Sequence, residues 1–416
     1  MHASWREGRR VLMMVENLPV PFDRRVWAEA RTLRAAGYEV TVVCPRGKFA
    51  LEPAEVIDGI QIYRHPLPLE AAGKLAYVVE YGASLFWEFV YAFKVFRATG
   101  FDAIHACNPP DVLFVVGAVF KFLFGKKFVF DHHDLNPELF EAKFARRGIL
   151  WRLLVLLERS TFAVADISIA TNESYRRIAV TRGRMPANRV FTVRSGPDLD
   201  RARPRPVDEG WRNRRAHMAA YVGVIGEQEG VDLLLRSMDH IVRELGRRDV
   251  QLVIVGAGPQ LDSVRQLSQN LGLSDYVTFT GRVDDDLLMT ILSTADVCVN
   301  PDRPNPMNDM STMNKVMEYM ALGKPIVQFD LKEGRVSAQD SSLYARNTDV
   351  ADFGEKILEL VDNPDRRSAM GALGRKRVLS QLSWSHEAPK LLAAYDALFA
   401  PETELAPVRR LRGTNE

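Results

Sequence analysis

Cysteine is scarce in this chain of 416 residues: Cys44, Cys107 and Cys298 are the only three, each in or at the end of an apolar strand-like run. An odd number of cysteines without a CxxC spacing argues against both a disulfide framework and a zinc site. This usage is typical of a reducing compartment. We therefore expect a cytoplasmic protein that holds no metal.

Long uncharged apolar runs are missing as well. The nearest approach to a membrane span is Leu75–Phe96, which Glu80, Glu88 and Lys94 interrupt. The start of the chain is basic but lacks the apolar run of a signal peptide. The sequence therefore predicts no transmembrane helix. The aromatic residues of Leu75–Phe96 suit either a buried helix or a helix lying at a membrane interface.

Neither sign of charge dominates, because 55 Lys and Arg residues face 53 Asp and Glu residues, a formal net charge of +2. Nucleic-acid-binding proteins usually carry a clear basic excess, so no nucleic-acid partner is expected. The small basic excess lies in the first half of the chain. It suits peripheral contact with an anionic membrane at the inner face of the plasma membrane, or ordinary solubility.

Short apolar runs alternate with helical patterns through both halves, and this predicts an α/β fold with parallel sheets. The strands expected in the first half are Arg10–Glu16, Tyr38–Cys44, Ile60–Arg64, Asp102–Ala106, Lys127–Asp131, Ala165–Ala170 and Val190–Val193. Those expected in the second half are Ala219–Ile225, Val250–Val255, Val277–Thr280, Val297–Asn300, Ile326–Phe329 and Leu343–Arg346.

The segment 201–215 is rich in Pro and Arg without a periodic apolar face, which is typical of an exposed linker. Two doubly wound domains are therefore expected, with the ligand in a cleft at the carboxyl ends of their strands. The expected parts are residues 1–200, a linker at 201–216, residues 217–383, a C-terminal helix at 384–400 and a disordered tail at 401–416.

The stretch from Met310 to Pro325 predicts a helix that Ser311 or Thr312 caps and Gly323 ends. Lys315 and Glu318 are three residues apart and share a polar face with Asn314. A helix N-terminus suits a diphosphate, and a glutamate further along suits sugar hydroxyls. The alternative is an ion pair on a solvated helix face.

The motif Gly256-Ala257-Gly258 follows a predicted strand and resembles part of a dinucleotide fingerprint. Leu261 stands where that fingerprint needs its third glycine, and Pro259 favours a tight turn. We therefore do not expect a dinucleotide cofactor.

His132 and His133 follow a strand, so they point to opposite faces and do not form one metal site. His133 with the neighbouring Asp134 is placed for acid–base or electrostatic catalysis at the strand's carboxyl end. The alternative is a histidine that caps a turn.

Two further loops lie at strand ends. The loop after the first strand leads through Asp23, a candidate N-cap, into a helix that begins with Arg24 and Arg25. Two guanidinium groups at a helix N-terminus can bind a phosphate. The turn around Gly196 follows the last strand of the first half, and its backbone could face the cleft.

The sequence from Glu318 to Pro325, E-Y-M-A-L-G-K-P, resembles the nucleotide-sugar motif of retaining glycosyltransferases of family 4. The likeness extends to ENLPVPFDRRVWAEA near the start, DHHDLNPE, LVIVGAGP and NKVMEYMALGKP, and is closest to bacterial members that build surface polysaccharides. It implies the GT-B fold, in which two Rossmann-like domains face each other across a cleft and the last helix crosses back to the first domain.

The resemblance also implies roles for single residues. Glu318 would bind the donor ribose, His133 would lie near the donor sugar, and Gly223 and Gly226 would belong to the turn under the diphosphate. It implies no metal and no cofactor besides the nucleotide-sugar donor, for which we expect a UDP-sugar rather than a GDP-sugar.

Three positions depart from the family pattern. Met310 stands where a second glutamate is usual, Val224 where an arginine is usual, and Glu229 where a lysine is usual. Two cations expected on the diphosphate are therefore missing. The available replacements are Arg24, Arg25, Lys315 and Arg282.

Three functions follow from these observations. The first is transfer of a sugar from a nucleoside-diphosphate sugar to a lipid-linked or saccharide acceptor, in surface or exopolysaccharide biosynthesis. The second is a sugar-nucleotide epimerase on the same fold. The third is a catalytically silent scaffold that binds glycan or protein, which the missing cations favour.

Overall fold

A computed structural model describes residues 6–47, 50–66, 74–144 and 146–399, with only the backbone described for residues 74–81. The chain forms two compact units. The first unit combines Met1–Asn136, Gly148–Val193 and Ala388–Glu416. The second combines Pro137–Arg147 with Arg194–Glu387. The expected boundary near residue 200 thus falls at Val193.

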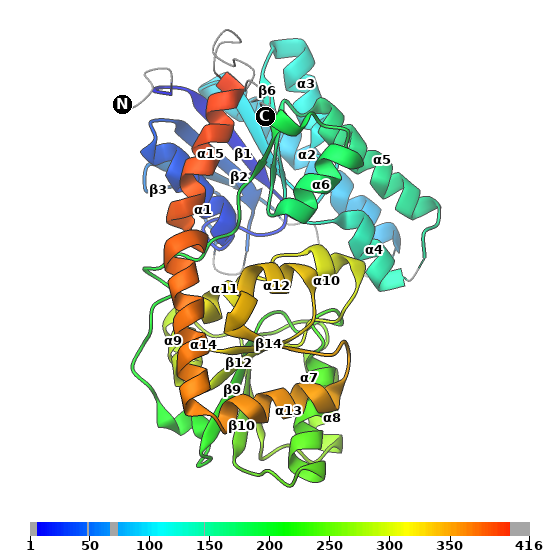
Figure 1. The fold of residues 1–416 in the computed structure, drawn as a ribbon. Helices are drawn as coiled ribbons and strands as arrows, with labels where there is room; N and C mark the ends of the chain where they lie inside the picture. The colour runs from blue at the N-terminus through cyan, green and yellow to red at the C-terminus, as the bar shows by residue number, and fades with distance from the viewer. Residues whose placement is uncertain (1–5, 48–49, 67–73, 145, 400–416) are drawn as a thin grey trace, which may run out of the picture. The chain divides into compact units, whose positions relative to one another are not determined.

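The first unit contains an eight-stranded sheet in the order β3-β4-β2-β1-β5-β6-β7-β8. Its described strands are parallel except β3, which pairs antiparallel with β4. The strands are β1 (Arg10–Val15), β2 (Glu39–Pro45), β3 (Ala54–Ile57), β4 (Ile60–His65), β5 (Ala103–Cys107), β6 (Lys127–His132), β7 (Ile167–Ala170) and β8 (Val190–Thr192). The helices are α1 (Arg24–Ala35), α2 (Lys74–Ala98), α3 (Phe114–Phe124), α5 (Ile149–Val164), α6 (Glu173–Thr181) and η1 (Ala187–Arg189) (Figure 1).

The second unit contains a six-stranded parallel sheet in the order β11-β10-β9-β12-β13-β14. Its strands are β9 (His217–Val222), β10 (Val250–Val255), β11 (Val277–Gly281), β12 (Val297–Asn300), β13 (Ile326–Phe329) and β14 (Ser342–Ala345). The helices are α4 (Asn136–Phe144), η2 (Glu209–Arg212), α7 (Val231–Asp239), η3 (His240–Glu244), α8 (Leu261–Asn270), α9 (Asp285–Thr294), α10 (Pro306–Met310), α11 (Asn314–Ala321), α12 (Lys332–Ala338), η4 (Gln339–Ser341), α13 (Val350–Val361), α14 (Pro364–Arg377) and η5 (Val378–Leu382).

Two predicted helix boundaries have different outcomes. Asp23 caps α1 as predicted, since its side chain accepts a hydrogen bond from the Val26 amide. The expected cap of the helix around Glu318 is wrong. Ser311 ends the short helix α10, and α11 begins after Met313 without a side-chain cap. The short helix α10, which Asn305 caps and Pro306 begins, precedes the predicted helix and was not predicted.

Gly323 ends α11 as predicted. Its φ is +70°, the left-handed region that glycine adopts without strain. The Gly323 amide donates to the Met320 carbonyl, and the Lys324 amide donates to the Tyr319 carbonyl. These two bonds form a Schellman motif, which satisfies the last carbonyls of the helix before β13 begins.

The segment 201–215 is irregular, as predicted, but it is not a free linker. Arg201, Arg205 and Arg212 form ion pairs with Asp285, Asp286 and Asp296 of the second unit. Ala202 is also buried, at 2% exposure. The arginines that suggested a solvated linker instead fix this segment along the second unit.

The last helix, α15 (Trp384–Phe399), contributes its residues from Ala388 onward to the first unit. There Tyr395 is buried, and its ring lies 5.3 Å from the ring of Tyr38. Arg6 and Asp396 form an ion pair at 2.5 Å. The tail predicted at 401–416 lies outside the described residues.

Among the described helices, none is long and apolar enough to cross a membrane. Helix α2 covers the run predicted at Leu75–Phe96, and it is partly buried. Ala92 and Val95 are buried against the first unit, whereas Phe86, at 60% exposure, faces solvent.

Candidate functional site

Each unit brings together one group of the predicted residues. In the first unit the group lies at the carboxyl end of β6, around Asp131 and His133. Asp131 is completely buried, and its Oδ2 lies 2.5 Å from Nε2 of His133, whose side chain is 14% exposed. Nε of Arg25 lies 3.0 Å from the same Nε2, so the carboxylate and the guanidinium together orient the imidazole ring.

His132 points to the other face of the sheet, as strand alternation predicts. It is fully buried, and its ring lies 5.3 Å from the ring of Phe162. Burial lowers the pKa of His132 to about 3, so this histidine is neutral at physiological pH. The two histidines therefore do not form a common metal site.

The guanidinium of Arg25 is hydrogen-bonded within this buried group. Its Nε and Nη2 donate to the two carboxylate oxygens of Asp131 at 3.2 and 2.8 Å, and its Nη1 donates to the Val193 carbonyl at 2.9 Å. Nη2 also lies 3.0 Å from Glu29. With these partners and 7% side-chain exposure, the guanidinium has its hydrogen-bond donors occupied. The expectation that Arg25 is available for a diphosphate is therefore wrong in this conformation.

The protonation of the group follows from burial and charge. Burial raises the pKa of Asp131, but the positive charges of Arg25 and His133 outweigh it and leave that pKa well below its ordinary value. Burial raises the pKa of Glu29 well above its ordinary value, although Arg25 opposes the shift. These opposite shifts favour the negative charge on Asp131 and a proton on Glu29.

Sequence reasoning missed the residues behind this group. His105 of β5 lies 3.4 Å from Asp131 and 3.5 Å from Glu29, and its Nδ1 lies 2.8 Å from Oη of Tyr395. Burial lowers the pKa of His105, so it is neutral and orients its neighbours by hydrogen bonding. The only sequence signal was a polar residue inside an apolar strand.

Asp134, the other predicted catalytic residue, lies beside His133, and Asn108 fixes the backbone of both. Oδ1 of Asn108 accepts from the amides of His133 and Asp134 at 2.6 and 3.2 Å, and its Nδ2 donates to the Asp134 carbonyl at 2.7 Å. Burial raises the pKa of Asp134. Arg24 is exposed on the first turn of α1.

Two groups of side chains have the composition of a metal site. The first contains Glu29, Cys107, Asp131 and His133. Arg25 already supplies a positive charge among these carboxylates, and burial raises the pKa of the Cys107 thiol well above its ordinary value. The second group consists of Glu16, His65 and Glu88.

The second group is also buried in the first unit. Nε2 of His65 lies 3.5 Å from Glu16 and 3.8 Å from Glu88. Burial raises the pKa of Glu88 well above its ordinary value. A proton on Glu88 therefore reduces the repulsion between the two carboxyl groups.

In the second unit, the predicted donor-binding residues gather where β9 ends. The loop from Gly223 follows β9 and is held by backbone and side-chain hydrogen bonds. The Gly223 amide donates to the Val255 carbonyl and the Ile225 amide to the Ala257 carbonyl, both at 3.1 Å. Oη of Tyr221 donates to the Val224 carbonyl at 2.8 Å.

The glycines after β10 allow this loop to approach. A Cβ on Gly256 would lie 1.8 Å from the Gly223 carbonyl oxygen, and a Cβ on Gly258 would lie 2.4 Å from that of Ile225. Both distances are impossible for a real side chain. The glycines of the motif that resembles a dinucleotide fingerprint therefore allow two backbone loops to lie in contact.

Helix α11 is fixed against the same strand ends by Tyr319. Its Oη accepts from the Val222 amide at 2.9 Å and donates to the Val299 carbonyl at 3.3 Å. This places Lys315 beside the loop. Its Nζ lies 4.9 Å from the centre of the Tyr221 ring, and 3.5 Å from where a Cβ on Gly223 would be.

Lys315 also has a buried partner that the sequence did not suggest, since its Nζ lies 2.7 Å from Oδ1 of Asp302. Burial raises the pKa of Asp302. Burial and the charge of Asp302 raise the pKa of Glu229, and Lys315 opposes that shift. Gly226 lies beside Glu229, because a Cβ there would be 2.6 Å from Oε2 of Glu229.

Glu318 lies on the same helix, with 9% exposure, and forms an ion pair with Arg201. Arg201 in turn lies 3.2 Å from Asp285. The predicted pairing of Glu318 with Lys315 on one solvated face is wrong, because each residue has a different partner. The ribose-binding role of Glu318 remains a prediction.

Three predicted donor ligands lie outside this group. Asn314 is exposed at the first position of α11, and Arg282 is exposed directly after β11. Gly196 has a structural explanation, because a Cβ there would lie 2.5 Å from the Leu382 carbonyl oxygen. Its predicted contact with a donor has no support in this geometry.

Two sequence profiles of glycosyltransferases match the chain. Residues 23–201 match the profile described as "Glycosyltransferase Family 4", and residues 216–363 match that of "Glycosyl transferases group 1". Together the two profiles span most of the chain. The two matched regions cover both candidate sites, from Arg24 and Arg25 to Glu318.

Two relatives show the range of this chain's similarity. A GDP-mannose-dependent alpha-(1-6)-phosphatidylinositol monomannoside mannosyltransferase of Mycobacterium tuberculosis is 30% identical over 227 residues, 52% of this chain and 58% of the relative. The match thus spans little more than half of that relative's length. A D-inositol 3-phosphate glycosyltransferase of Thermomonospora curvata is 28% identical over 400 residues, 88% of each chain.

Solved structures confirm the predicted GT-B fold. Sucrose-phosphate synthase from Thermosynechococcus elongatus matches with a TM-score of 0.78 at 20% identity, over 94% of this chain and 99% of that one. Anabaena HepE in complex with UDP-glucose matches with a TM-score of 0.72 at 16% identity, over 94% and 100%.

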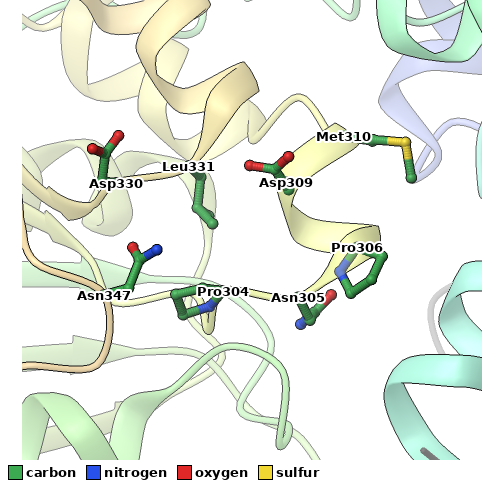
Figure 2. Close-up of a pocket in the computed structure, with 8 residues that line it drawn as sticks. All are labelled: Pro304, Asn305, Pro306, Asp309, Met310, Asp330, Leu331 and Asn347. Carbon is green, nitrogen blue, oxygen red and sulfur yellow. The ribbon is translucent and has the colours of Figure 1, made fainter.

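One cavity lies around the position where the family glutamate is replaced. It has a volume of about 450 Å³. Oδ1 of Asp309 accepts from the Lys332 amide at 2.8 Å. In Figure 2, Asp309 points toward Asp330 and Leu331, whereas Met310 extends the other way. The lining residues are Pro304, Asn305, Pro306, Asp309, Met310, Asp330, Leu331 and Asn347.

Proposed function

We propose that this chain transfers a sugar from a nucleoside-diphosphate sugar to a lipid-linked or saccharide acceptor. The observation that carries the proposal is the arrangement at the end of β9. The uncapped start of α11, Lys315 and the Gly223 loop lie together, and Glu318 follows three residues after Lys315. Unpaired amides and a lysine suit a diphosphate, and a carboxylate farther along the helix suits ribose hydroxyls.

Donor binding must then exchange two internal ion pairs. Lys315 would turn from Asp302 to the diphosphate, and Arg201 would release Glu318 to the ribose. An acid left behind in a buried place needs a proton, and burial already raises the pKa of Asp302 and of Glu229. Protonation of these acids would offset the two cations that Val224 and Glu229 fail to supply.

In the first unit, His133 would act near the donor sugar as a charged or hydrogen-bonding group. Its Nε2 lies 2.5 Å from Oδ2 of Asp131 and 3.0 Å from Nε of Arg25, and these two contacts hold the ring in place. Asp134, with its raised pKa, is the adjacent group that can carry a proton. We further propose that transfer retains the donor's anomeric configuration, requires no metal ion and uses UDP-sugars in preference to GDP-sugars.

The acceptor and the biological setting rest on less direct support. The family resemblance suggests surface or exopolysaccharide biosynthesis at the inner face of the membrane. The relatives are named for phosphatidylinositol mannoside and inositol phosphate acceptors. A lipid-linked or polyol-containing acceptor is the class common to these suggestions.

A panel of UDP- and GDP-sugars tests the proposal directly. We expect one UDP-sugar to be consumed, with nucleoside diphosphate released in proportion to a glycosylated product when a lipid-linked acceptor is supplied. Conversion of the donor into an isomeric nucleotide sugar would instead indicate an epimerase. If calorimetry detects no binding of UDP, GDP or their sugars, the internal ion pairs of Lys315 and Glu318 favour the silent scaffold.

A further inference from the structure

The first unit exposes an unusual number of large apolar side chains on three of its helices. At the end of α3, Phe122 is 73% and Leu123 is 72% exposed, and at the start of α5, Ile149 is 85% exposed. Single exposed apolar residues are ordinary, but a group of this size indicates an interaction surface. Its members are Phe86, Val90 and Phe93 of α2, Phe122, Leu123 and Phe124 of α3, and Ile149, Leu150, Leu153 and Leu156 of α5.

Helix α3 packs against both α2 and α5. The Phe96 ring of α2 lies 4.8 Å from the Phe124 ring of α3. Nζ of Lys121 on α3 donates to the Val164 carbonyl at the end of α5, at 2.7 Å. Figure 1 shows α3 and α5 as neighbours in the first unit. We call the exposed side of these helices the α2–α3–α5 surface.

The exposed charge on the described side chains of these helices is basic. Helix α2 also contains Glu80, whose side chain lies outside the described residues. In residues 82–98, 114–127 and 149–164 the acidic residues are Glu88 and Glu158, and both are completely buried. The basic residues are Lys94, Arg97, Lys121, Lys126, Lys127, Arg152 and Arg159. Apolar side chains beside Lys and Arg, without exposed acids, suit an anionic lipid surface, where long basic side chains reach the headgroups.

We propose that the α2–α3–α5 surface docks on an anionic lipid bilayer, with Phe122, Leu123 and the Ile149–Leu153 turn inserted among the lipids. A protein partner or a second copy of this chain fits less well, because lysines are depleted in protein interfaces. Docking deepens the proposed function, because a lipid-linked acceptor is found at a bilayer. Vesicle binding needs no sugar transfer, so the two proposals can fail separately.

Co-sedimentation of the full chain with vesicles tests the docking. We expect binding to vesicles of phosphatidylcholine mixed with phosphatidylglycerol, and little binding to phosphatidylcholine alone. The pairs Phe122→Ser with Leu123→Ser, and Ile149→Ser with Leu153→Ser, should each lower the bound fraction about tenfold, since each removes two membrane-inserted side chains. Leu373→Ser is the control, because Leu373 is 50% exposed on α14 of the second unit.

Folding and activity distinguish the outcomes. Both double variants should keep the wild-type melting temperature and the wild-type rate of nucleotide-sugar consumption with a water-soluble acceptor. Absence of binding to the anionic vesicles, or equal binding by the double variants and Leu373→Ser, would overturn the docking proposal even if sugar transfer is observed. Self-association in solution that both pairs abolish, without vesicle binding, would assign the surface to a second copy instead.

Discussion

Replacing Arg25 with alanine separates two interpretations of this residue, as a ligand of the donor diphosphate and as a buried structural cation. In the structure its guanidinium donates to Asp131 at 3.2 and 2.8 Å and to the Val193 carbonyl at 2.9 Å, and it lies 3.0 Å from Glu29. The variant leaves Asp131 as a buried carboxylate with a weaker positive environment. Removing one partner of a buried ion pair typically costs about 3–5 kcal/mol.

The low end of that range applies here, because His133 still faces Asp131 and burial already favours a proton on Glu29. A loss of about 3 kcal/mol corresponds to a fall of about 6–12 °C in the melting temperature of a unit of this size. The matched control is Arg24→Ala, since Arg24 is the exposed neighbour on the same helical turn. An exposed charge contributes about 0–1 kcal/mol.

Thermal and urea unfolding of both variants, without nucleotide, measures this difference. If Arg25→Ala melts with Arg24→Ala and the wild type, and only its affinity for nucleoside diphosphate falls, then Arg25 is a phosphate ligand and the buried-cation interpretation is refuted. A lower melting temperature with unchanged affinity supports the interpretation from the structure.

The pH dependence of the same variant gives a second check. The pKa of Asp131 is depressed in the folded protein, so its contribution to stability is complete above its unfolded pKa and is lost as pH falls through the folded value. The alanine variant lacks most of this depression. We therefore expect the stability gap between wild type and Arg25→Ala to be constant at neutral pH and to narrow in acid. A gap that widens toward low pH would contradict the assignment.

Four further outcomes follow. Glu318→Gln should raise the donor KM or lower kcat about tenfold or more, because a charged hydrogen bond contributes roughly 1.5–3 kcal/mol; unchanged steady-state constants would exclude a ribose contact. Lys315→Ala should weaken nucleoside diphosphate binding much more than nucleoside binding in calorimetry, whereas Asn314→Ala should affect both little; equal losses for both ligands would refute a phosphate role. Affinity for nucleoside diphosphate should fall as pH rises through the elevated pKa of Glu229, and Glu229→Gln should remove that dependence; an unchanged pH profile would show that this acid does not face the phosphates. Donor turnover should survive EDTA, and loss of activity that Mg²⁺ or Mn²⁺ restores would disprove metal independence.

Local patterns predicted the parts of the fold that depend on local physics. Apolar runs gave the strands, alternation placed His132 and His133 on opposite faces, and Asp23 and Gly323 marked helix ends. Each of these features depends on a few neighbouring residues, so a single sequence contains the information.

The errors concern contacts between distant segments. Arg25 was assigned to a diphosphate ligand because arginine suits phosphate. Arg201 was assigned to an exposed linker because arginine suits solvent. Their partners Asp131 and Glu318 lie 106 and 117 residues away. No local pattern reveals such a pair. The short helix α10 was not predicted, because its 5 residues are too few to show an apolar period.

The order of synthesis gives Tyr395 a further significance. The first unit is discontinuous in sequence. Tyr395, near its C-terminal end, hydrogen-bonds to His105 in the buried group behind His133. Because translation proceeds from the N-terminus, this bond cannot form until the whole second unit has left the ribosome. Leu391 and Ala394, both at 0% exposure, are likewise supplied to the first core at that late stage. Until then, His133 and its strand lack the contacts that α15 supplies. Truncation within α15 would therefore remove contacts made by residues that are synthesised much earlier.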